Sequence, residues 1–434
     1  MQNRNDSEHD ATLTNPFLSL DESLLPLVGD RQARPQLPPK QIFIPIGSLG
    51  GCGFCGAKRN LKVCNSCALF KAKKINLKTS YIFPAYLYEL SRELGSILPH
   101  PAFHSNVIKI PSPSAKKAPK SKSTLDHTIV LGKEEYGYPP DVEAWWTSFN
   151  SENTGKSVGE FRRYTAHFTR EVNALEITVS VCFALVAGLY FVDGKSDESE
   201  SSELDDGGGG PERIKAPYYR LEYGQNPICD FGICKGKIQG RTHYVQKWTY
   251  HDTKTDTYHT LKDPDNHYWM YFKTVTGDEI VLDCNSSSFG MDVFVDIESL
   301  ADKLPEELAT SGSRYVPALF IGPGERRGSA SHPYTLIEEK RFSVLRDVEL
   351  HKAIMMMYLK EDRPENTRVI KEFVGRVQGE PCSDKQGGTI WMQWPTQTEI
   401  LGLFLKDGVF KELVKPFTFM KDPFLVTPSL RDLF

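Results

Sequence analysis

The sequence predicts an α+β protein in two parts: a small module built on four cysteines, tethered to a larger domain of mixed helices and antiparallel sheet. Three observations support this division. Four of the nine cysteines fall within residues 52–67. A lysine-bearing segment, 111–124, follows with no apolar residue beyond alanine. From residue 125 onwards, helical patterns flank a clear hairpin pattern.

The N-terminal residues 1–40 are polar and rich in proline near their end, which predicts a disordered arm. One short apolar stretch, 17–28, could form a small docking helix. Residues 41–110 are assigned to the cysteine module and the helix after it. In "PAYLYELSRELGSILP", Leu87, Leu90, Leu94 and Ile97 recur at helical spacing behind Pro84.

The segment "PSPSAKKAPKSKST", 111–124, predicts a solvated linker, with a nuclear-import signal as the alternative. Residues 125–434 then form the α+β domain. It opens with two amphipathic helices, in "YPPDVEAWWTSF" and in "SVGEFRRYTAHFTREVNAL", where Ser157 and Glu160 form a capping box.

The uncharged run 177–192 has 16 residues, whereas a membrane span needs about 20. Its β-branched residues and Gly188 favour a buried strand or buried segment, so no membrane association is expected. Next, the acidic, glycine-rich segment 196–210 predicts a disordered insert.

Alternation of apolar and polar residues in 267–283 around Thr276-Gly277-Asp278 predicts a hairpin. Helical patterns return in "IESLADKLPEEL", "VELHKAIMMMYL" and "PENTRVIKEFVGRV". The three consecutive methionines, 355–357, are interpreted as core residues rather than a binding face.

Cysteine usage indicates the compartment. Nine cysteines in 434 residues is an odd and sparse set, and the chain starts without a signal-peptide pattern. We therefore expect an intracellular protein, cytoplasmic or nuclear, in which paired C-x-x-C thiols hold metal rather than each other.

The cysteines form two such pairs, Cys52/Cys55 and Cys64/Cys67, separated by eight residues. Zinc takes four ligands tetrahedrally, and a C-x-x-C pair supplies two sulfurs about 2.3 Å from the ion. Two pairs on so short a loop can close on one ion. The sequence therefore predicts that Cys52, Cys55, Cys64 and Cys67 bind Zn²⁺.

The neighbourhood of these cysteines is basic, since no Asp or Glu occurs between Arg31 and Tyr88. Lysines there can neutralise the charge of −2 that four thiolates leave around Zn²⁺. The alternative is a nucleic-acid-binding surface, although no aromatic-rich segment that could contact bases accompanies it.

The cysteine spacing also resembles the first half of the MYND-type zinc finger. Together with "GYPPDVEAWW", "FTREVNALEI" and "HYWMYFKTVTGDEIVLD", it resembles the large MYND-type zinc-finger proteins of filamentous fungi. The resemblance covers residues 51–67 and parts of 130–350. It implies zinc binding and a protein-interaction role, without a known reaction for the larger domain.

The second half of the motif is missing, because no cysteine follows Cys67 until Cys182. In the family the two zinc ions are cross-braced, so a literal truncation would leave two half-sites. Either the four thiolates have re-paired around one zinc, or the sequence comes from a gene model that lost an exon, or metal binding has decayed. The first is favoured, and His100 or His104 could assist.

No catalytic pattern is complete. SET-MYND methyltransferases, suggested by the MYND resemblance, carry an N-H-S-C segment, and "DCNSSSFG", 283–290, approaches it without the histidine. Hydrolase, metalloprotease, P-loop and kinase signatures are missing, and "LFIGPGERRGS" is interpreted as a loop. Histidines recur every eight residues at His243, His251, His259 and His267, where exposed sheet and turn positions are expected rather than a second metal site.

The resulting hypothesis is a zinc-binding protein-protein interaction protein without catalytic activity. The alternative is a nucleic-acid-associated regulatory protein that uses the basic zinc module. A second alternative is a methyltransferase related to the SET-MYND enzymes.

Overall fold

The computed structural model describes residues 73–95, 100, 105–109, 124–135, 167–168, 171–190, 219–240, 245–291, 293–296, 315–323, 334–358 and 363–407. By its internal contacts the chain divides into two units, and every described residue lies in the one formed by residues 42–193 and 204–434. Helices and mixed sheets make up these residues, so the predicted α+β class is confirmed.

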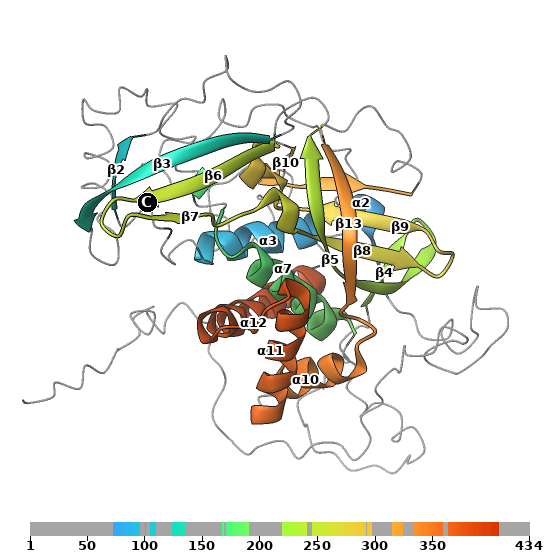
Figure 1. Cartoon of the computed structure of the whole chain (residues 1–434). Helices are drawn as coiled ribbons and strands as arrows, with labels where there is room; N and C mark the ends of the chain where they lie inside the picture. Colours follow the sequence, from blue (N-terminus) through green and yellow to red (C-terminus); the bar gives the residue numbers. More distant parts are fainter. Residues whose placement is uncertain are drawn as a thin grey trace, which may run out of the picture. The chain divides into compact units, whose positions relative to one another are not determined.

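The larger sheet has seven strands in the order β1-β4-β5-β8-β9-β12, with β13 also paired to β5 (Figure 1). All neighbours are antiparallel except β1 and β4, which are parallel, so the sheet is mixed rather than purely antiparallel as expected. The strands are β1 (Lys73–Asn76), β4 (Tyr219–Tyr223), β5 (Asn226–Gly240), β8 (His267–Thr274), β9 (Glu279–Asp283), β12 (Leu319–Ile321) and β13 (Tyr334–Ser343).

Strands β8 and β9 form the predicted hairpin, with Met270 opposite Leu282. Gly277 occupies the turn at φ 89°, a conformation that residues with a side chain rarely adopt. The Thr274 amide donates to the Asp278 carbonyl at 2.9 Å and closes the turn. The hairpin is confirmed because alternation and turn chemistry agree.

A smaller sheet has the order β2-β3-β6-β7, in which β3 and β6 are parallel. Its strands are β2 (Ser105–Lys109), β3 (Thr124–Glu135), β6 (Val245–Asp252) and β7 (Thr257–His259), and a separate pair consists of β10 (Phe294–Asp296) and β11 (Tyr315–Pro317). Two 3-10 helices, η3 (Pro264–Asn266) and η4 (Ser286–Phe289), lie in the connections. The predicted loop "LFIGPGERRGS" therefore begins with strand β12.

The α-helices are α2 (Leu77–Ser80), α3 (Ile82–Gly95), α7 (Ala174–Leu189), α10 (Val348–Tyr358), α11 (Pro364–Gln378) and α12 (Asp384–Asp407). Helices α3, α10 and α11 match the predicted helical patterns. Met355 is buried in the core, as predicted for the methionine run. Among the described helices none is long and apolar enough to span a membrane.

Helix α7 corrects the expected buried strand. All its residues except Gly188 are buried, and it contacts α12 and α3 as well as β4, β5 and β8 (Figure 1). A run that is apolar on every side has no periodicity that distinguishes a buried helix from a buried strand. The predicted buried segment is confirmed, and the alternative of a buried strand is wrong.

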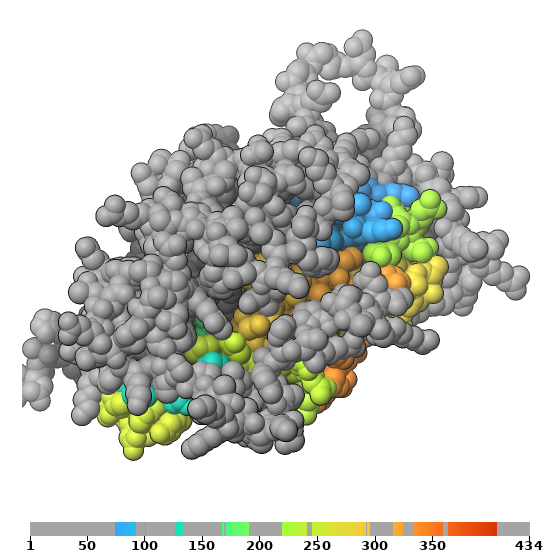
Figure 2. Space-filling view, turned by 90° about the horizontal axis from the view of Figure 1, so that it is seen from above, coloured from blue at the N-terminus to red at the C-terminus, as the bar shows by residue number. Residues whose placement is uncertain are grey.

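Residues 73–95 correct the predicted domain boundary. Strand β1 pairs with β4, and their segments lie side by side in Figure 2. Helix α3 packs on α7 and α12, with Ile82 and Leu87 in the same apolar core as Phe404. The helix after the cysteines therefore belongs to the larger domain instead of a module beyond a linker. The leucine spacing predicts a helix with a single buried face. In the structure Tyr86, Tyr88 and Glu89 are buried as well, so the helix is packed on more than one side.

Several predictions concern residues outside the described part of the chain. These are the arm 1–40, the four cysteines of 52–67, the linker residues 111–123, the helices predicted within 138–149 and 297–308, and the insert 196–210. They stay predictions.

Candidate functional site

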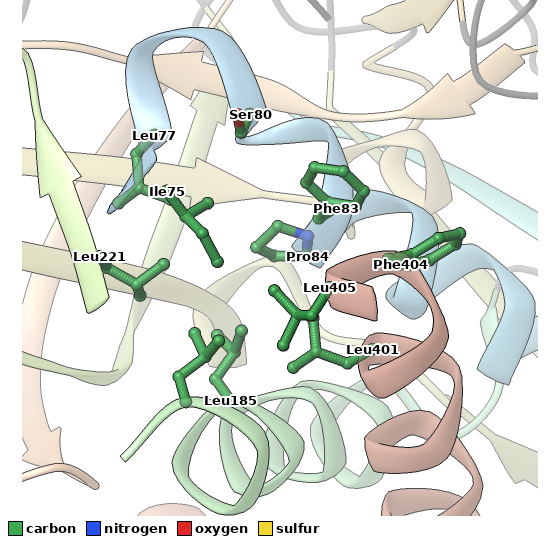
Figure 3. Close-up of a pocket in the computed structure, with 11 residues that line it drawn as sticks. Ile75, Leu77, Ser80, Phe83, Pro84, Leu185, Leu221, Leu401, Phe404 and Leu405 are labelled. Atoms are coloured by element: carbon green, nitrogen blue, oxygen red, sulfur yellow. The ribbon is translucent and has the colours of Figure 1, made fainter. Parts of the chain in front are cut away.

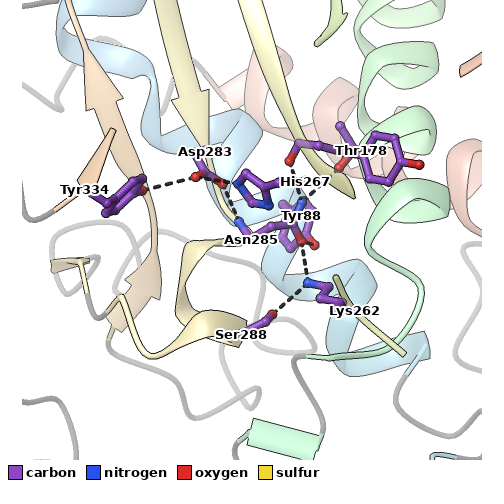
Figure 4. A network of polar contacts seen from close by, with 9 residues as sticks. Tyr88, Thr178, Lys262, His267, Asp283, Asn285, Ser288 and Tyr334 are labelled. Carbon is purple, nitrogen blue, oxygen red and sulfur yellow. Dashed lines mark hydrogen bonds and ion pairs between the residues drawn. The ribbon is translucent and has the colours of Figure 1, made fainter. Parts of the chain in front are cut away.

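A buried polar network joins the two ends of the larger sheet's central hairpin to η4 (Figure 4). Asp283, at the end of β9, lies 2.8 Å from Nε2 of His267, at the start of β8. The Tyr334 hydroxyl on β13 donates to the same carboxylate oxygen at 3.1 Å. The backbone N–H of Asn285 donates to the other carboxylate oxygen at 2.8 Å. His267 and Asp283 are 2% and 0% exposed, so the Asp283 carboxyl group bonds to protein groups in place of water.

Asn285 connects this carboxylate to both central helices. Its Nδ2 donates to the Thr178 hydroxyl of α7 at 3.3 Å and to the Tyr268 carbonyl at 3.1 Å. Its Oδ1 accepts from the hydroxyl of Tyr88 on α3 and from Lys262 Nζ, the latter at 3.3 Å. The amide thus ties α3, α7 and β8 together.

Lys262 points its ammonium group into this network (Figure 4). Nζ donates to the Ser288 hydroxyl at 2.7 Å and lies 5.8 Å from the centre of the Phe289 ring. Burial lowers the pKa of Lys262 to about 8, although the carboxylates of Glu171 and Asp283 oppose the shift. The residue as a whole is half-buried.

A second buried cluster surrounds Glu171, just before α7. One carboxylate oxygen, Oε2, lies 3.3 Å from His100 Nε2 and 3.4 Å from His167 Nε2, and it also accepts the hydroxyl of Tyr250 on β6. Burial alone would raise the pKa of Glu171, but the charge of His167 and the hydrogen bond with His100 outweigh it and lower the pKa to about 2.

Aromatic rings enclose the second cluster. The His100 ring stacks on Phe168 with 4.9 Å between centroids. The Trp248 indole lies 4.3 Å from the His167 ring and 4.2 Å from the His127 ring. Because His127 lies on β3 and Trp248 on β6, the cluster joins the smaller sheet to the segment that leads into α7.

We call these two clusters, together with Lys262 between them, the polar seam. Its side chains are of types that are common in active sites. Perturbed pKa values of such groups indicate function when they face a cleft. Here the seam residues bond to one another, and the carboxylates of Glu171, Asp283 and Glu176 all oppose the lowering of the Lys262 pKa. The arrangement is therefore one that fastens secondary-structure elements together.

A separate apolar cavity lies between β1, α3, α7 and α12 (Figure 3). Its volume is about 10 Å³, and leucines dominate its wall, among them Leu185, Leu221, Leu401 and Leu405. That volume is close to the minimum for one water molecule, and a water would find no polar partners there. It is a packing gap rather than a ligand site.

The predicted zinc ligands Cys52, Cys55, Cys64 and Cys67 lie outside the described residues. His100, suggested as an assisting ligand, is instead bonded to Glu171, and His104 lies outside the described residues. In the part of the chain that is described, no group of three or more His, Cys, Asp or Glu is arranged to hold a metal ion. Cys182, Cys229, Cys284 and Cys382 are free cysteines.

The eight-residue histidine series divides in the structure. His251 on β6 contacts Asp256 at 2.9 Å, and the exposed His259 on β7 contacts Thr257 at 2.8 Å. His267 corrects the expectation of exposed positions, because it is buried against Asp283. His243 lies outside the described residues.

The segment "DCNSSSFG" approaches a methyltransferase motif in sequence. In the structure its polar residues are part of the polar seam. Asp283, Asn285 and Ser288 all bond to protein partners there. Sequence reasoning missed Tyr88, Thr178 and Lys262, because they share no motif with this segment and are distant from it in the chain.

Comparison of the chain with protein-family models, with curated proteins and with solved structures found no match. The resemblance to fungal MYND-type proteins therefore stays an expectation based on the residues quoted for it.

Proposed function

We propose that this chain is a zinc-binding protein-interaction protein in which Cys52, Cys55, Cys64 and Cys67 hold one Zn²⁺. The observation that carries the proposal is the spacing C-x2-C-x8-C-x2-C, which supplies four sulfurs on a loop short enough for one tetrahedral ion. A protein partner is proposed because small zinc modules of this kind commonly present a rigid surface, and the MYND resemblance implies that role.

The connection between the proposed module and the described fold is short. Cys67 precedes the first residue of β1, Lys73, by six positions, and β1 is paired along its length with β4. Six residues span at most about 20 Å. A folded zinc module would therefore stay close to the edge of the larger sheet, where it and the domain could present one combined surface.

Charges near this edge fit the proposal. Lys74 pairs with Glu222 of β4 at 3.4 Å, and Lys78 is exposed on α2. The remaining cations, Lys58, Arg59, Lys62, Lys71 and Lys73, can balance the thiolate charge of the zinc site. Thiolate ligands require a reducing environment, so the proposed location is the cytoplasm or the nucleus.

The metal is tested by denaturing the purified full chain and titrating released zinc with a chromophoric chelator. We expect about one ion per chain, and loss of the ion in the Cys52→Ser and Cys64→Ser variants. Cys382→Ser is the matched control, because Cys382 is a half-buried free cysteine far along the chain. A metal-free chain whose melting temperature does not respond to added zinc would overturn the proposal.

The interaction role is tested with the same three proteins. A protein partner bound by the wild type and by Cys382→Ser, and released on chelation, would support it. Binding of duplex DNA or single-stranded RNA that falls steeply with salt would replace it with the nucleic-acid role.

A further inference from the structure

We propose that two copies of this chain associate through β13, the strand of one copy pairing antiparallel with the same strand of the other. The two-fold axis lies between Glu339 and Lys340. This inference goes beyond the proposed zinc module and does not depend on it, because it rests on the sheet alone.

Strand β13 offers an accessible edge. Of the strands in the described part of the chain, only β5 pairs with it. It has ten residues, whereas β1 and β12, at the two ends of the strand order, have four and three. Residues 337–340 in its middle are exposed. Because successive side chains of a strand point to opposite faces, four exposed residues in a row show that solvent reaches both faces here. Such an edge can accept another strand.

The central charges of β13 make the strand complementary to itself. Their order is Glu338, Glu339, Lys340, Arg341. In an antiparallel pair centred between 339 and 340, Glu339 lies opposite Lys340 of the other copy, and Glu338 lies opposite Arg341. Opposite charges directly across two strands are stabilising, and like charges are destabilising. A parallel pair sets each charge against its own kind, and an axis on Glu339 or on Lys340 sets that residue against itself. The charges therefore favour one register.

A β-bulge makes this register compatible with the faces of the strand. The pairing of β13 with β5 shifts between Glu338 and Lys340, so one extra residue resets the alternation of side chains. Glu338 and Arg341 consequently share a face although they are three positions apart, and Arg341 donates to Glu338 at 2.7 Å. Residues directly opposite in paired strands point to the same face. Without the bulge, the pairing of 338 with 341 would violate this rule.

Apolar residues match on the other face. Leu336 packs against the core cluster that contains Tyr271, whereas Phe342 packs against the larger cluster that contains Phe231. Ile337, next to Leu336, alternates to the face of Phe342. The axis sets Ile337, which is 43% exposed, opposite the half-buried Phe342 of the other copy. Pairing thus removes apolar surface from water in the same register that the charges favour.

The two residues beside the axis are available for new contacts. Lys340 is exposed and has no ion-pair partner among the residues that the structure describes. Glu339 lies 3.3 Å from Lys237 of β5, but its side chain remains 43% exposed. A carboxylate has two acceptor oxygens, so Glu339 can bind a second ammonium group. Each copy therefore presents one free cation and one accessible carboxylate to the other.

Sedimentation equilibrium of the purified full chain tests the association. We expect the weight-average mass of the wild type to rise with concentration from that of one chain towards twice that value. Glu339→Lys and Lys340→Glu each place like charges opposite at two points of the interface. Each variant should weaken association at least about tenfold. Lys385→Glu makes the same change of net charge at an exposed position on α12, and this control should associate as the wild type does.

A mixture of the two reversed variants gives the sharpest test. A chain with Glu339→Lys carries two lysines beside the axis, and a chain with Lys340→Glu carries two glutamates. Each should fail to associate with itself, but the two together should form a mixed dimer. The double variant Glu339→Lys with Lys340→Glu should dimerise like the wild type. Damage to the fold cannot produce this pattern, and thermal unfolding of each variant checks the fold separately.

Hydrogen exchange locates the interface. Amides within 337–342 should exchange more slowly as the concentration rises, while those of β8 do not respond. A chain that stays monomeric at every concentration would overturn the proposal and leave the charges as a guard that prevents edge pairing. A dimer that neither reversed variant weakens would also overturn it, because the interface would then lie elsewhere, for example in the zinc module.

Discussion

The hydroxyl of Tyr88 on α3 donates a hydrogen bond to the side-chain oxygen of Asn285, 197 residues later in the chain. Tyr88→Phe removes that donor within a buried site and leaves Lys262 as the other donor to the same oxygen. We expect the free energy of unfolding to fall by about 1–2 kcal/mol, measured by urea denaturation.

Tyr258→Phe is the matched control, because Tyr258 on β7 is 65% exposed and its loss of a hydroxyl should cost less than about 0.5 kcal/mol. Equal effects of the two substitutions would show that the Tyr88 hydroxyl contributes nothing specific.

Lys262 predicts a dependence of stability on alkaline pH. A basic group whose pKa is lowered in the folded state binds more protons when unfolded, so stability rises with pH between about 8 and its ordinary pKa of 10.5. Lys262→Met lacks this contribution. Relative to that variant, the wild type should gain about 1–2 kcal/mol from pH 8 to pH 10, less than the full shift implies because the residue is half-buried. A difference that stays constant with pH would contradict the assignment.

Gly236 on β5 allows β13 to approach closely. A Cβ at this position would lie 2.0 Å from the carbonyl oxygen of Ile337, a backbone atom that cannot move without disturbing the ladder. Gly236→Ala should therefore destabilise the chain by more than about 2 kcal/mol.

Gly388 in α12 provides the opposite case, because it is exposed and a Cβ added to it would meet nothing within 4 Å. Gly388→Ala should stabilise by up to about 1 kcal/mol, through helix propensity alone. Thermal unfolding of the two variants side by side tests the pair, and similar melting temperatures would refute the account of Gly236.

The elements predicted correctly are those in which local signals agree. The β8–β9 hairpin combines alternation with Gly277 in its turn, and α11 begins at Pro364 and ends before Gly379, which has φ 93°.

The remaining features depend on contacts between distant residues. Strand β5 contains Gly232 and Gly236, which weaken a strand pattern but are required by the approach of β13. The polar seam unites Tyr88, Glu171 and Lys262, which have no common spacing and meet only through the topology. The sequence gives no sign that His267 is buried, because its partner, Asp283, lies across the hairpin rather than beside it in the chain.

The most direct measurement for the central claim is X-ray absorption spectroscopy at the zinc edge on the purified full chain. If Cys52, Cys55, Cys64 and Cys67 share one ion, the first coordination shell will consist of four sulfur atoms at about 2.3 Å. Cys382→Ser will leave this shell unchanged, whereas Cys64→Ser will remove or alter it. A shell of two sulfurs completed by oxygen or nitrogen would instead indicate an orphaned half-site and contradict the single four-cysteine site.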